Sequence, residues 1–181
     1  MPDISPQIRR LCQVIRVGGG LFVAGVLAIY LYSWLLPSQP FPPLRFHLAG
    51  LPTNALASLG VGERLLVALL SVPYLAALVW AFYRMHRMLQ GFERGEFFDA
   101  ATVGHLRAFS GFLLLAKLLA LLAMHARVHV VNYLLESSGV RGFINLSLDD
   151  LSVLLMCALF FLIARTLEEA RRLSEENKGF I

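Results

Sequence analysis

RMHRMLQGFERGEFFDAATVGHLR, residues 84–107, is the longest polar interruption between two strongly apolar halves of the chain. Of the 181 residues, 57% are apolar and only 15% are charged, whereas a soluble domain carries roughly 25% charged residues. This shortage of charge indicates a membrane protein, and the length indicates one domain. We therefore interpret residues 84–107 as a cytoplasmic elbow that joins two membrane hairpins of an all-α protein.

Each side of the elbow contains two apolar segments long enough to form a membrane helix. Roughly 20 apolar residues cross the hydrocarbon core, since each adds about 1.5 Å to a helix. The first segment is too long for the apolar core of a cleaved signal peptide, and residues 34–37 form a poor cleavage site. The sequence predicts a single domain with four transmembrane helices, at about residues 17–36, 65–83, 108–126 and 151–167. The helix of the third span can run from residue 100 to about residue 133.

The positions of Lys and Arg predict how the chain is threaded, because cytoplasmic segments carry more of both residues. Eleven lie in the N-terminal segment, the elbow, and the cytoplasmic tail at 168–181 with its adjoining helix end. Four lie in or beside the external loops at 37–62 and 127–148, and the sixteenth is Lys117. Both termini are therefore predicted to be cytoplasmic, with helices that extend into the cytoplasm. The net charge of +4 lies at the ends of apolar segments, so nucleic acid is not an expected partner.

Residues 1–16 permit two interpretations. They form either a short amphipathic helix on the inner membrane surface or a charged flank that continues into the first span. In both cases the basic residues of the cytoplasmic face are expected to attract anionic lipid headgroups.

Two features of the predicted spans concern helix packing. Gly20, Ala24 and Ala28 recur every four residues, which creates a face of small side chains where another helix can approach closely. Pro73 lies near the middle of a helix predicted for residues 63–90. Because proline lacks a backbone N–H, it is expected to kink this helix and free a carbonyl group.

Lys117 is the sharpest candidate for a functional residue, because it interrupts an apolar span. A charge at the bilayer centre costs about 2.5–3.5 kcal/mol and normally faces the protein interior or a wet cavity. The apolar cores contain no acidic residue, so an acid on another protein or a nearby polar group is the expected partner. Alternatively, Lys117 is buried without charge or extends to an interface. The nearby candidates in this intramembrane polar site are the carbonyl of Leu69, freed by Pro73, and the hydroxyls of Ser33, Ser71 and Tyr74.

Three histidines predicted on the outer side, His47, His125 and His129, are weak candidates for a zinc site. His125 and His129 are one helical turn apart, but Arg127 lies between them and no Cys or acid completes a known spacing. Polar residues at the membrane interface are the preferred explanation. No nucleotide-binding or hydrolase motif occurs in the sequence, so we expect no catalytic residue, no metal, no cofactor and no enzyme.

The elbow combines turn chemistry with a family motif. Gly91 and Gly95 are expected to end one helix, and Asp99 is expected to cap the next. The elbow and the tail at 170–181 resemble the cytoplasmic motif and the charged ending of the domain of unknown function 2975 family, bacterial proteins with four membrane helices. The resemblance implies a small inner-membrane protein without established activity, in an accessory or regulatory role. Its motif residues here are Gly95, Glu96, Phe97, Phe98 and Asp99.

The leading hypothesis for function is a non-enzymatic accessory, regulatory or structural partner that acts through helix–helix and cytoplasmic-face contacts. Its expected partners are the lipid bilayer and either a second copy of the chain or another membrane protein. The alternative is a small transporter or channel component with a polar site around Lys117 and the Pro73 kink, because intramembrane charges and broken helices mark transport paths. A metal-dependent periplasmic enzyme, based on the three histidines, is the third hypothesis.

Overall fold

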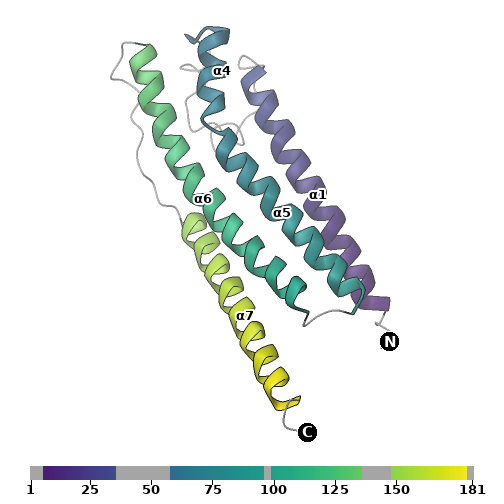
Figure 1. The fold of residues 1–181 in the computed structure, drawn as a ribbon. Coiled ribbons are helices and arrows are strands. Elements are labelled where there is room, and N and C mark those ends of the chain that lie inside the picture. Colours follow the sequence, from purple (N-terminus) through teal and green to yellow (C-terminus); the bar gives the residue numbers. More distant parts are fainter. Residues whose placement is uncertain (1–5, 36–57, 96–98, 136–147, 179–181) are drawn as a thin grey trace.

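The computed structural model describes residues 6–35, 58–95, 99–135 and 148–178. Every regular element in these ranges is an α-helix, which confirms the all-α prediction there (Figure 1). The first predicted external loop falls almost wholly outside the described residues. The helices are α1 (Pro6–Leu35), α4 (Val61–Leu69), α5 (Val72–Glu93), α6 (Ala100–Leu134) and α7 (Leu148–Lys178).

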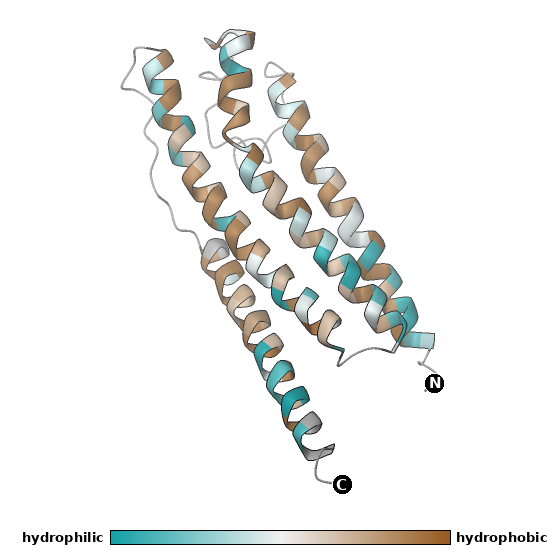
Figure 2. Cartoon of the chain, viewed as in Figure 1, coloured by the Kyte–Doolittle hydropathy of each residue, from teal (hydrophilic) through white to brown (hydrophobic). Residues whose placement is uncertain are grey.

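The long helices pack in an open row. Helix α1 packs on α5, α5 on α6, and α6 on α7, while the short α4 contacts α1 and α6. Neighbours in this row run antiparallel, so the start of α1, the connection between α5 and α6, and the end of α7 lie at the same end of the molecule (Figure 1). We call this end the charged end. Figure 2 shows polar residues gathered toward it and apolar residues along the middle of the helices.

Among the described residues, three helical segments are long and apolar enough to cross a membrane: Pro6–Leu35, Ala100–Leu134 and Leu151–Leu173. The bent pair α4 and α5 makes a fourth if it counts as one span. Large apolar side chains on these helices are exposed, with Leu21 at 69% and Leu155 at 71%. Water does not favour such a surface, whereas lipid does, so the chain is a membrane protein with several spans.

Two helix boundaries lie beyond the predicted membrane spans. Helix α1 is continuous from Pro6, so residues 6–16 extend the first span as a flank and do not form a separate surface helix. Helix α6 continues to Leu134, which confirms the long helix predicted to about residue 133, so the external segment begins with helical residues 127–134. The apolar spacing persists through this region, with Ala123, Val128 and Val131 all buried, and that packing keeps the segment helical.

The segment predicted as one kinked helix is two helices. Helices α4 and α5 meet at a break at Leu70 and Ser71, where their axes bend by 48°. Pro73 lies in the first turn of α5, where a missing N–H costs no intrahelical hydrogen bond. The proline therefore starts a new helix close to the expected kink.

Glycine sets how closely α1 approaches α5. A side chain added at Gly19 would meet Met85 and Phe82 of α5. By contrast, Gly20, Ala24 and Ala28 are exposed, and a side chain added at Gly20 would meet nothing within 4 Å. The contact predicted for these three small residues stays a prediction, and within the described residues α1 uses the neighbouring Gly19 for its packing.

The connection between α5 and α6 has the expected cap. The Asp99 carboxylate accepts a hydrogen bond of 3.1 Å from the backbone N–H of Ala101, which confirms the N-cap prediction. Gly95 has a φ of 80°, a conformation that glycine adopts without strain. Gly91, however, lies inside α5 and is buried against Thr102 of α6. Motif residues 96–98 lie outside the described residues.

Candidate functional site

A buried arginine lies beside the break between α4 and α5. Arg127 of α6 is only 3% exposed, although guanidinium groups are rarely buried unless their N–H donors are satisfied. Its Nη1 donates a hydrogen bond of 3.1 Å to the Ser71 hydroxyl, and its Nε donates one of 3.2 Å to the Ala123 carbonyl. Arg127 therefore connects the middle of the broken segment to α6.

Helix α1 reaches the same break through a tyrosine. The Tyr30 hydroxyl donates a hydrogen bond of 2.8 Å to the carbonyl of Ala68, the acceptor that also binds the backbone N–H of Ser71. The ring of Tyr30 packs edge-on against Tyr74, with 6.4 Å between the ring centroids. Tyr30 of α1 and Arg127 of α6 thus donate hydrogen bonds to the Ala68 carbonyl and the Ser71 hydroxyl at the break. Polar groups in a protein interior need such partners.

We call Tyr30, Ser71, Tyr74 and Arg127 the polar centre. It is enclosed by apolar side chains, and its four members carry three hydroxyl groups and one guanidinium. Hydroxyl and guanidinium groups can form hydrogen bonds to backbone groups of the protein itself or to an anionic or polar ligand. The buried apolar residues packed in the same cluster are Trp34, Leu59, Val67, Leu75, Ala123, Val128 and Val131.

Two of the predicted polar residues belong to this centre, and Lys117 is not among its members. Ser71 and Tyr74 are both buried beside the break, but the Ser71 hydroxyl binds Arg127. Lys117 is half-buried on α6, ten residues before Arg127, or about 15 Å along the helix. Its functional role stays a prediction.

Sequence reasoning missed Arg127 because it counted residues 127–148 as external to the membrane and did not consider which face of the continuing helix Arg127 occupies. A signal was present in the spacing of the residues around it. Ala123, Arg127 and Val131 recur every four residues, so in a continuing helix they occupy one face. All three are buried.

The predicted zinc ligands are only partly described. The Nδ1 atom of His125 lies 2.8 Å from the Leu121 carbonyl of its own helix, and His129 is exposed. His47 lies outside the described residues. Within the described part of the chain, no three His, Cys, Asp or Glu side chains gather as a metal site would require.

The charged end carries a second group of polar residues. Ion pairs connect neighbouring helices here: Arg16 of α1 with Glu93 of α5 at 3.1 Å, and Arg107 of α6 with Glu168 of α7 at 3.3 Å. Glu168 also lies 3.8 Å from Arg165. The side chains of Arg107 and Glu168 are about half exposed, whereas the Arg16–Glu93 pair is more buried.

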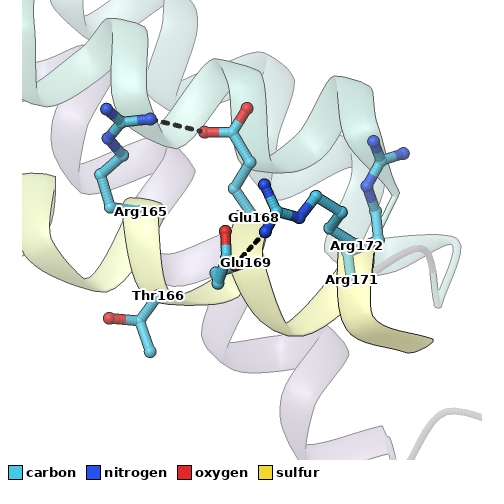
Figure 3. A pocket seen from close by; sticks show the side chains of 6 residues that line it. All are labelled: Arg165, Thr166, Glu168, Glu169, Arg171 and Arg172. Atoms are coloured by element: carbon cyan, nitrogen blue, oxygen red, sulfur yellow. Dashed lines mark ion pairs between the residues drawn. The ribbon is translucent and has the colours of Figure 1, made fainter. Parts of the chain in front are cut away.

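Two adjoining hollows open beside the ion pair of Arg107 and Glu168. One lies between the start of α6 and α7, with Ala100, Val103, Gly104, Arg107, Glu168 and Arg171 as its lining. The other lies along α7 and is shown in Figure 3, where Arg165 and Glu168 extend from the same side of the helix and Thr166 from the opposite side. We call the two together the α6–α7 hollow.

Comparison with known proteins agrees with the elbow motif. A family model described as a protein of unknown function, DUF2975, matches residues 20–181, which include every described helix in whole or in part. Searches of curated proteins and of solved structures found no match. The match covers most of the chain and confirms the resemblance that the elbow and tail predicted. This chain therefore belongs to the DUF2975 family of proteins of unknown function.

Proposed function

We propose that the chain is a bacterial inner-membrane protein with four spans and cytoplasmic termini, and that it acts as an accessory, regulatory or structural partner. The observation that carries this proposal is the charged end. The start of α1, the elbow and the end of α7 lie there together (Figure 1), and most of the Lys and Arg residues belong to these segments. Excess positive charge is typical of the cytoplasmic side.

Helix α7 supports a role in contacts with another protein. Among the described helices it packs mainly on α6, and its last turns carry exposed Arg172 and Glu169 side chains. Their ion pair is internal to one helix, so it leaves the outer surface of α7 available. A charged helix that projects at the membrane surface presents a docking face for a membrane or cytoplasmic partner.

Topology is tested by reporter fusions at both ends of the chain. A fluorescent protein that folds only in the cytoplasm should fluoresce at either terminus, and alkaline phosphatase, which is active only in the periplasm, should be inactive at both. A phosphatase inserted after residue 50 should be active. Activity of a terminal phosphatase fusion would overturn the proposed orientation.

Contacts are tested by photo-crosslinking in native membranes. A crosslinking amino acid at Glu169, at the charged end, should give discrete adducts with a second copy or with another protein. The same amino acid at the exposed Leu155, in the apolar part of α7, is the matched control and should react mainly with lipid. Monomers alone at both positions would count against the accessory role.

The second candidate function is a small transporter or channel component. Lys117 and the bend near Pro73 motivate it, and the buried Arg127 beside the helix break favours it further, since broken helices and intramembrane charges occur at transport sites. Proteoliposomes that contain the purified chain should then pass ions or small anions faster than empty liposomes. Equal flux across a panel of inorganic ions and organic anions would reject this candidate.

A further inference from the structure

The α6–α7 hollow lies at the boundary between apolar and charged sequence. On α6, Arg107 is directly followed by the apolar segment at 108–116. On α7, residues 151–164 are uncharged and Arg165 is the first charged residue after them. Figure 2 shows the colour change from brown to teal along α7 at this level. In a membrane-spanning helix this boundary lies at the depth of the lipid phosphates.

The hollow has an excess of positive charge. Its lining includes four arginines, at 107, 165, 171 and 172, and two glutamates, at 168 and 169. One carboxylate, that of Glu168, lies within 4 Å of two guanidiniums. The side chains of these three residues are 46–65% exposed. Exposed ion pairs contribute little to stability, so a phosphate can exchange with the carboxylate.

The floor of the hollow leaves room for a headgroup. Ala100 and Gly104 of α6 line it, and a side chain added at Gly104 would meet nothing within 4 Å. Small side chains of α6 and arginines from two helices thus converge on one side.

An apolar surface continues from the hollow toward the membrane interior. On α6, Gly111, Leu114 and Leu118 follow Arg107 at helical spacing, and all three are exposed. On α7, the exposed Phe161 lies one turn before Arg165. A molecule with a negative headgroup and acyl chains matches this sequence of charged and then apolar surface. A free phosphate ion uses only the charged part.

We propose that the α6–α7 hollow is a binding site for the phosphate group of an anionic phospholipid. The Arg107 and Arg171 guanidiniums bind the headgroup, and the acyl chains lie along the exposed apolar faces of α6 and α7. Glu168 acts as an internal competitor that occupies Arg107 when lipid is absent. The site extends the proposed function, because it fixes α7 at the cytoplasmic face beside its docking surface.

The test uses the full chain in nanodiscs of phosphatidylcholine with a minor fraction of phosphatidylglycerol. Native mass spectrometry measures how strongly the protein retains phosphatidylglycerol over phosphatidylcholine. Each arginine near a lipid headgroup contributes about fivefold, which corresponds to about 1 kcal/mol. The double variant Arg107→Gln with Arg171→Gln should therefore lower the preference by roughly 25-fold.

A matched control removes two positive charges elsewhere at the same end. Arg9 and Arg10 of α1 are exposed and lie outside the hollow, so Arg9→Gln with Arg10→Gln should lower the preference clearly less than the hollow variant does if the site is local. Thermal unfolding of both double variants checks that each is folded. An equal loss in the two variants, or no loss in the hollow variant, would show general charge attraction and overturn the site.

Glu168→Gln gives a test of opposite sign. Removal of the competing carboxylate should raise the preference for phosphatidylglycerol, whereas a purely structural ion pair predicts no gain. Inorganic phosphate, titrated by calorimetry into the protein in phosphatidylcholine nanodiscs, tests the soluble source. Binding of phosphate that needs Arg107 and Arg171, without any preference for phosphatidylglycerol, would overturn the lipid assignment. Because both nanodisc leaflets have the same composition, these outcomes do not depend on the proposed orientation.

Discussion

The hydrogen bond between Arg127 and Ser71 is predicted to stabilise the break between α4 and α5. The perturbation is a double-mutant cycle of Ser71→Ala, Arg127→Met and their combination. Methionine keeps an apolar chain of similar length but has no N–H donors, and alanine removes only the hydroxyl. The cycle measures the coupling free energy of the two side chains apart from their separate contributions.

The expected magnitude follows from burial and charge. Side-chain hydrogen bonds in membrane proteins average about 0.6 kcal/mol and reach about 1.7 kcal/mol, and bonds to charged groups contribute about 1.5–3 kcal/mol in proteins generally. The Arg127–Ser71 bond is 3.1 Å long, and both residues are at most 3% exposed. We therefore expect a coupling of about 1.5–1.7 kcal/mol, at the overlap of the two ranges.

The assay is reversible unfolding of the purified chain in detergent, with the free energy of unfolding measured for each corner of the cycle. For each atom removed, Ser71→Ala should lower the free energy of unfolding more than Arg127→Met does. The reason is that Ser71→Ala leaves a buried guanidinium with one hydrogen-bond acceptor fewer. The double variant should be more stable than the sum of the two single effects predicts, since apolar groups then replace both partners.

The matched control is the ion pair between Arg172 and Glu169 on α7. Its atoms are closer, at 2.8 Å, but the two side chains are 64% and 55% exposed. The cycle of Arg172→Met with Glu169→Ala should give at most about 0.5 kcal/mol, because water and salt screen an exposed pair. A coupling below about 0.5 kcal/mol at Arg127 and Ser71 as well would refute a stabilising role for the buried bond.

Three further changes test the helix contacts, each by the free energy of unfolding in detergent. Tyr30→Phe should destabilise by about 0.6–1.7 kcal/mol because it removes a hydroxyl bound to a partly buried carbonyl of α4. An equal loss for Tyr133→Phe, at a residue that is 84% exposed, would contradict this. Gly91→Ala should lower the free energy of unfolding by about 1–3 kcal/mol through a clash with α6. Gly104→Ala adds a methyl group in open space and should raise it by about 0.5–1 kcal/mol. A stabilising Gly91→Ala with a destabilising Gly104→Ala would refute the close packing of α5 on α6 at Gly91. Asp99→Ala should cost about 0.5–2 kcal/mol through the lost N-cap, and Asp99→Asn should restore most of it.

Several features of the fold followed from local chemistry. Uninterrupted apolar segments with the length of a bilayer predicted the long helices, because only a helix satisfies its own backbone in lipid. Asp99 capped α6 as its side chain dictates, and the chain bent close to Pro73. The elbow and tail motifs identified the family. Each of these depends on neighbours within a few residues, so a sequence contains the information directly.

Other features depended on which helix faces which. A sequence shows Gly19 and Gly20 as equivalent neighbours, but only Gly19 faces α5. The sequence also shows two basic residues near apolar segments, Lys117 and Arg127. The rule that a charge inside a membrane span marks a functional site selected Lys117, because it lies in the middle of a predicted span. The structure buries Arg127 because α6 continues beyond the predicted span and passes the break in the facing helices.

The sequence by itself therefore determined the helical class, the membrane setting, the family and the cap of α6, since composition and short-range spacing control them. Only the tertiary structure decided the open row of helices, the polar centre around Arg127 and the α6–α7 hollow. The physical reason is that each needs groups separated by many residues to meet: Arg127 and Ser71 are 56 positions apart, and Arg107 and Glu168 are 61 positions apart. Helix packing alone brings such groups within hydrogen-bonding distance.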